Sequence, residues 1–196
     1  MYALADTLRA EHRNFIHVLQ LMYAHTKLGE VNDPASCRFM LNAVLYMQEF
    51  GDGVHHEKDS ILLGRIQALD PSTWGLCLRL RNLRNWLRES EVEMQRCIAS
   101  AGTGDGDLNG TVKSQVEEYC SSYSAYIGLD EQEALPAALD CLTETDWRAI
   151  CKLFNQPVDP VFGLEAQRRY RTPYDGIMAY NDGMALQSGR YKADVH

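Results

Sequence analysis

The sequence predicts an all-α protein, an antiparallel up-down-up-down four-helix bundle followed by a short fifth helix and a C-terminal extension. Apolar residues recur every three or four positions over long segments, which is the helical period. Asp33-Pro34 and Asp70-Pro71 mark helix starts, because aspartate caps a helix and proline suits its first turn. The connections between these segments are short, which favours antiparallel neighbours.

Composition limits the classes of partner. The chain has 196 residues, enough for one substantial core, and a formal net charge of −8. That charge argues against a nucleic-acid partner and against an anionic membrane surface. No apolar run reaches the length of a membrane span, and the N-terminus has no signal-peptide pattern. The six cysteines are scattered without a close pair, so we expect reduced thiols in a cytoplasmic protein.

The first two helices are predicted at residues 2–28 and 34–69. His12 interrupts the apolar stripe of the first helix. The second helix meets Gly51-Asp52-Gly53, where we expect a kink or a brief distortion, and then resumes to its end.

The third helix is predicted at residues 72–101. One inward stripe passes through Arg84, and a neighbouring stripe through Leu83 and Trp86 is equally apolar, so the rotation of this helix stays open by one residue. The glycine-rich stretch 102–110 lacks the spacing of a calcium-binding EF-hand loop and is interpreted as a linker.

The fourth helix is predicted at residues 111–140, where Asp130 interrupts the core face and Pro136 predicts a bend or break. A capping box at 143–146 predicts a short fifth helix over 144–154. We therefore expect a bundle domain at 1–155. We expect residues 156–196 to form a C-terminal arm that packs on the bundle or on a partner, where it would support a homodimer.

Polar residues interrupt core stripes on several helices. His55 and Asp59 lie four residues apart on one helix face that is otherwise apolar. A buried charge is costly unless it meets a partner or a metal ion. Imidazole and carboxylate groups projecting inward from facing helices are the way in which helix bundles build iron sites. The residues expected to point inward are His12, His55, His56, Asp59, Arg84, Tyr126 and Asp130.

Several short motifs, in order and spacing, make the chain resemble the hemerythrin-like, HHE cation-binding proteins of bacteria. The motifs are Glu11-His12-Arg13-Asn14, His55-His56-Glu57-Lys58-Asp59, Leu135-Pro136-Ala137-Ala138, Leu142-Thr143-Glu144-Thr145-Asp146-Trp147 and Asp159-Pro160-Val161-Phe162-Gly163. The resemblance covers about residues 8 to 163. It implies one or two irons held inside the bundle, for oxygen binding or for iron and redox sensing.

The resemblance assigns metal-ligand positions to His12, His55, His56, Asp59 and Asp130. It also implies two departures from the family. Arg84 lies near the place of a third-helix histidine, and Tyr126 takes the place of a fourth-helix histidine. Arginine stays protonated and cannot bind a metal, so we expect Arg84 to satisfy a buried carboxylate instead. We therefore expect at most one iron, and an Arg84→His, Tyr126→His double substitution should restore fuller occupancy.

Other interpretations stay open. His12 is also explained by a bond to a backbone carbonyl, the paired histidines by a role at the kink, and Tyr126 by a hydrogen bond in the core. On that basis the protein is a metal-free bundle that binds a partner or senses a small ligand. No residue argues specifically for an enzyme.

Overall fold

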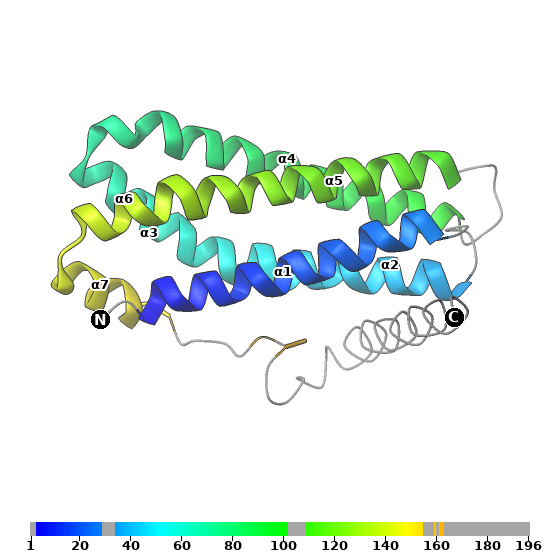
Figure 1. Cartoon of the computed structure of the whole chain (residues 1–196), viewed down its shortest axis with the longest axis horizontal. Coiled ribbons are helices and arrows are strands. Elements are labelled where there is room, and N and C mark those ends of the chain that lie inside the picture. The colour runs from blue at the N-terminus through cyan, green and yellow to red at the C-terminus, as the bar shows by residue number, and fades with distance from the viewer. Residues whose placement is uncertain (1–2, 29–33, 102–108, 155–158, 160, 163–196) are drawn as a thin grey trace, which may run out of the picture.

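Figure 1 shows the computed structural model of the chain, which describes residues 3–28, 34–101, 109–154, 159 and 161–162. Regular structure within these ranges is helical and includes no strand, which confirms the predicted all-α class. None of the described helices combines the length and apolar character that a membrane span requires. The predicted linker and C-terminal arm lie almost wholly outside the described residues.

The first helix, α1, spans Ala3–Leu28. The predicted second helix comprises three consecutive elements, α2 (Pro34–Tyr46), η1 (Met47–His55) and α3 (His56–Leu69). The segment η1 is π-helical, and the His56 N–H donates to the carbonyl of Gly51, five residues back. The distortion predicted at Gly51-Asp52-Gly53 therefore lies inside a widened turn, of the kind that often marks functional sites.

The third helix begins with the short turn η2 (Pro71–Thr73) and continues as α4 (Trp74–Ala101). The Asp70 carboxylate accepts a hydrogen bond from the Ser72 N–H at 2.9 Å, as expected of a helix cap. The structure settles the rotation of α4. Apart from Arg84, the first predicted stripe is buried: Cys77, Leu80, Leu87, Glu91, Met94 and Ile98.

The fourth helix comprises α5 (Asn109–Leu129), η3 (Asp130–Ala134) and α6 (Leu135–Cys141). The segment η3 is a second π-helix, in which the Leu135 N–H donates to the Asp130 carbonyl. The distortion predicted at Pro136 therefore lies one turn earlier. Proline has no N–H to donate, so a widened turn before Pro136 accommodates a residue that a regular helix disfavours.

The fifth helix, α7, spans Glu144–Lys152 and confirms the predicted capping box. The Thr143 hydroxyl accepts a bond from the Asp146 N–H at 3.2 Å, and the Asp146 carboxylate accepts one from the Thr143 N–H at 2.9 Å. Beyond α7, Asp159 accepts hydrogen bonds from Tyr46 at 2.9 Å and from Asn14 at 2.8 Å, which ties this segment to α1 and α2.

The long helices pack around one hydrophobic core. Helix α1 contacts α2 and α5, and α4 contacts the same two helices, so these four elements enclose a common interior. They lie side by side along the long axis of the molecule, as Figure 1 shows. The polar residues that interrupt the apolar stripes therefore have a shared space to occupy.

Candidate functional site

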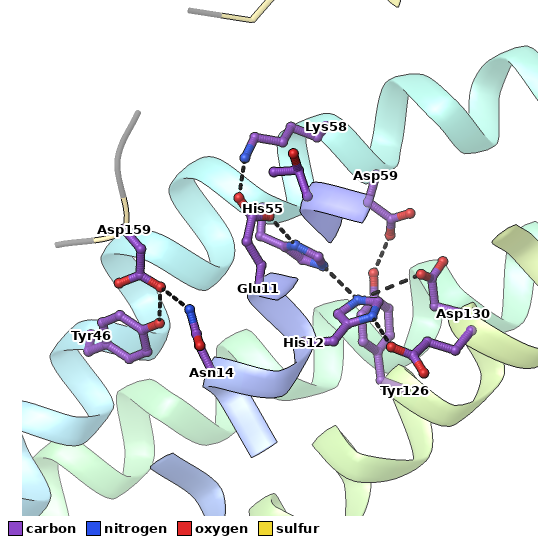
Figure 2. A network of polar contacts seen from close by, with 12 residues as sticks. Glu11, His12, Asn14, Tyr46, His55, Lys58, Asp59, Tyr126, Asp130 and Asp159 are labelled. Carbon is purple, nitrogen blue, oxygen red and sulfur yellow. Dashed lines mark hydrogen bonds and ion pairs between the residues drawn. The ribbon is translucent and has the colours of Figure 1, made fainter. Parts of the chain in front are cut away.

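Both π-helical segments deliver a candidate residue to the interior. Segment η1 ends at His55 and η3 begins at Asp130, while the neighbouring helices add His12 and Asp59. All of these side chains are buried. Figure 2 shows that they point toward one another from α1, η1, α3 and η3. The structure thus brings together residues that are up to 118 positions apart in the sequence, from His12 to Asp130.

The centre of the site is a pair of histidines. The Nε2 atoms of His12 and His55 lie 3.1 Å apart, and the two rings meet at an interplanar angle of 63°. The same His12 Nε2 is 3.6 Å from a carboxylate oxygen of Asp130. Two ring nitrogens and a carboxylate oxygen therefore face one small volume.

The opposite nitrogen of each ring contacts a carboxylate. The Nδ1 of His12 is 3.0 Å from Glu131, and the Nδ1 of His55 is 2.8 Å from Glu11. A carboxylate accepts hydrogen bonds, so each Nδ1 carries the proton of a neutral ring and each Nε2 presents a lone pair. The 3.1 Å contact then sets two lone pairs against each other. A cation or a shared proton between the nitrogens would relieve this repulsion.

Electrostatics disfavour an additional proton between the two Nε2 atoms. Burial, followed by repulsion from His55, lowers the pKa of His12 to about 4. Burial likewise lowers the pKa of His55. Both rings are therefore neutral near pH 7.

Two carboxylates complete the interior site. The Tyr126 hydroxyl donates a hydrogen bond to Asp59. The other oxygen of Asp59 and both oxygens of Asp130 are buried without a hydrogen-bond partner. Burial, followed by the charge of nearby Asp59, raises the pKa of Asp130 well above its ordinary value. Without a bound cation, the folded protein therefore favours the protonated, neutral form of Asp130.

His56 lies at the edge of this arrangement. Its Nδ1 contacts Asp52 at 2.7 Å, and its buried Nε2 has no hydrogen-bond partner. Its ring packs against Tyr126 at 5.0 Å between centroids and stacks with Tyr123 at 6.0 Å. Tyr126 itself is a neutral donor, because burial, followed by the charge of Asp59, raises its pKa well above its ordinary value.

Sequence reasoning missed Glu11 and Lys58 as functional residues. Lys58 is only 1% exposed, and its ammonium donates to one oxygen of Glu11 while His55 contacts the other. Burial raises the pKa of Glu11, but the bonds and charges of His55 and Lys58 outweigh burial and lower it. Glu11 is therefore ionised. The sequence held one signal for Glu11, since it continues the apolar stripe through Leu4, Leu8 and Phe15.

The expectation for Arg84 is wrong. Its guanidinium donates to the Ser60 hydroxyl at 2.6 Å and lines a pocket between α3 and α4, outside the histidine cluster. Long arginine side chains reach water from a partly buried backbone position, and Arg84 does so here. The buried cation beside the histidines is Lys58.

The residues present fit a metal ion in part. Two imidazole nitrogens bound to one ion through bonds of about 2.0–2.1 Å lie about 3 Å apart when the bonds are near right angles, which the His12–His55 separation of 3.1 Å matches. Partnerless oxygens of Asp59 and Asp130 supply anionic donors. As the side chains lie, however, no group of three or more histidine, cysteine, aspartate or glutamate residues in the described part of the chain is arranged to hold a metal.

Comparison of the chain with protein-family models, with curated proteins and with solved structures gives no significant match. The functional interpretation therefore depends on the geometry of the site.

Proposed function

We propose that the chain is a divergent hemerythrin-like protein, an antiparallel four-helix bundle that holds a single iron ion at its buried centre. The observation that supports this proposal most strongly is the His12–His55 contact. The two Nε2 atoms face each other at 3.1 Å, while both Nδ1 atoms contact carboxylates. The packing of α1, α2, α4 and α5 around one core supports the bundle.

His12, His55, Asp59 and Asp130 would hold the ion, with His56 at the edge of the set. Histidines that bind metals usually donate their second ring N–H to a carboxylate, which fixes the ring and its tautomer. Glu131 does this for His12, and Glu11 does it for His55. Mixed imidazole and carboxylate donors suit iron. A bound cation would also balance the negative charges of Asp59 and Asp130, where burial, followed by the charge of Asp59, otherwise raises the pKa of Asp130.

Bound iron would supply reversible oxygen binding or a change of oxidation state, so the proposed role is oxygen, redox or iron sensing. The histidines and both aspartates are at most 1% exposed. The chain's own groups would therefore exclude bulk water and admit only small molecules. Tyr126 would hold Asp59 in place through its hydroxyl.

Titration of the metal-free protein with Co²⁺ tests the metal site through its visible absorption. We expect saturation at one ion per chain, and a loss of the absorption in His12→Ala and in His55→Ala. His17→Ala is the matched control, because His17 also lies on α1 but has an aromatic contact with Phe162 outside the cluster. Absorption equal in all four proteins would place any bound metal elsewhere.

A metal-free bundle that senses a small ligand or binds a partner is the second candidate. The buried Lys58–Glu11 ion pair and the Tyr126–Asp59 hydrogen bond favour it, because both satisfy carboxylates without a metal. In this case Co²⁺ would produce no saturable absorption, and chelator treatment would leave thermal stability unchanged. A metal that binds only the folded state would instead raise that stability.

A further inference from the structure

A second candidate site lies between α3 and α4, and Arg84 forms part of its lining. It is a pocket of about 220 Å³. That volume is below the range of about 300–1,000 Å³ typical of sites for drug-sized ligands, so it suits a small ion or a small polar molecule. The polar and glycine residues that line it are Ser60, Gly64, Arg81, Arg84, Asn85 and Arg88.

The lining is strongly cationic in a protein of net charge −8. Arg81, Arg84 and Arg88 follow one another at three and four residues along α4, which places them on one helix face. Arg88 donates to Asp52 at 3.1 Å. Arg81 and Arg84 form no ion pair within the described part of the chain, and the pocket lining itself contains no carboxylate.

Local hydrogen bonds hold part of the pocket in place. The Ser60 hydroxyl accepts from Arg84 at 2.6 Å and donates to the His56 carbonyl at 2.7 Å. This fixes one guanidinium against the wall formed by α3. The pocket is open beside Gly64 on the same wall. A Cβ atom at this position would have no other atom within 4 Å. A guanidinium presents a planar set of donors that matches the oxygens of phosphate and carboxylate groups.

We propose that this pocket binds a small phosphate group, either inorganic phosphate or the phosphate of a small monoester. Arg81 and Arg84, which form no ion pair in the described part of the chain, and Arg88, which is shared with Asp52, favour a dianion over a monoanion. The Asn85 amide adds a neutral donor. The proposal does not depend on iron in the histidine cluster. It does adjoin that cluster, because Asp52 contacts both Arg88 and His56. An anion that draws Arg88 away would change the charge beside His56.

Isothermal titration of the full chain with inorganic phosphate and with glycerol phosphate tests the proposal. The titrations are made at pH 7.5 and constant ionic strength, with EDTA present so that no phosphate binds through a metal. We expect saturable binding of at least one of the two at one site per chain, and acetate should not compete. Arg81→Ala and Arg84→Ala should each weaken the binding about tenfold, the usual scale for losing one charged hydrogen bond.

Gly64→Glu is the sharper variant, because its Cβ atom would have no other atom within 4 Å and its carboxylate would repel an anion in the pocket, so it should abolish binding. Gly75→Glu is its matched control. Gly75 is also helical, has equal space for a Cβ atom with no other atom within 4 Å, and lies outside the pocket lining. Phosphate binding that survives Gly64→Glu, that is lost equally in Gly75→Glu, or that is absent from the unmodified chain would overturn the proposal.

Discussion

Lys58 donates a hydrogen bond to the same Glu11 carboxylate that orients His55. The lysine is buried, so its charge is balanced inside the protein and not by water. The pair also connects the stability of the fold with the candidate site. If the Glu11 carboxylate moved, His55 would lose the group that fixes its tautomer.

Lys58→Met should destabilise the protein by about 3–5 kcal/mol, because it leaves the Glu11 charge buried without its partner. Glu11→Gln combined with Lys58→Met removes both charges and should recover most of that loss. Urea denaturation of the two single variants and the double variant measures the coupling. Strictly additive changes in the free energy of unfolding would show that the ion pair is not the cause.

Gly51→Ala should destabilise the chain by about 1–3 kcal/mol through overpacking in the π-helical segment η1. A Cβ atom at this position would lie 2.8 Å from the hydroxyl of Tyr123. Gly53→Ala is the matched control, since its Cβ would have no contact closer than 3.9 Å. Adding Tyr123→Phe to Gly51→Ala removes the clashing oxygen and should restore stability. Equal melting temperatures for the two alanine variants would refute this account of Gly51.

Glu91 makes stability depend on pH. Burial, followed by repulsion from Asp52, raises the pKa of Glu91 to about 8, above the ordinary value of 4.5. The folded state therefore binds more protons than the unfolded state between these values, and its stability falls as pH rises from about 4.5 to 8. Glu91→Gln should flatten this dependence while leaving an acceptor for Tyr119, which lies 2.6 Å from Glu91. The free energy of unfolding, measured by denaturation at pH 5, 6.5 and 8, tests this dependence.

The control for Glu91→Gln is Glu89→Gln, an exposed position on the same helix, which should keep the pH dependence of the unmodified chain. If Glu91→Gln lost stability between pH 5 and 8 as steeply as the unmodified chain does, Glu91 would not be the responsible group.

Replacing Tyr126 by histidine should strengthen iron retention, whereas replacing Arg84 should not. Tyr126 contacts Asp59 inside the cluster, while Arg84 reaches Ser60 in the outer pocket. We expect Tyr126→His to slow iron loss to a chelator about tenfold, a usual scale for changes around a metal site. Arg84→His should match the unmodified chain. A gain in Arg84→His alone would mean that its imidazole reaches the interior.

The sequence was informative where a local pattern of residues decides the secondary structure. The period of apolar residues, the Asp70-Pro71 signal and the Thr143–Asp146 capping box predicted helices close to those of the structure. Glycines also indicated the distortion in η1.

Other features depend on distant contacts. Lys58 looks like a surface residue in the sequence, and only the buried Glu11 on α1 explains its place in the core. The second π-helical segment has no glycine, so its position before Pro136 was not predictable from composition. Arg84 occupies an apolar stripe, but its long side chain turns outward to Ser60. This orientation depends on the packing of α3 against α4.

Iron content measures the central claim most directly. The protein is loaded with Fe²⁺ without oxygen, separated from free metal, and analysed for iron per chain beside the His12→Ala, His55→Ala double variant. The account predicts one iron in the unmodified chain and almost none in the double variant, with both proteins folded by circular dichroism. Two irons per chain, or an iron content that the double substitution does not change, would contradict it.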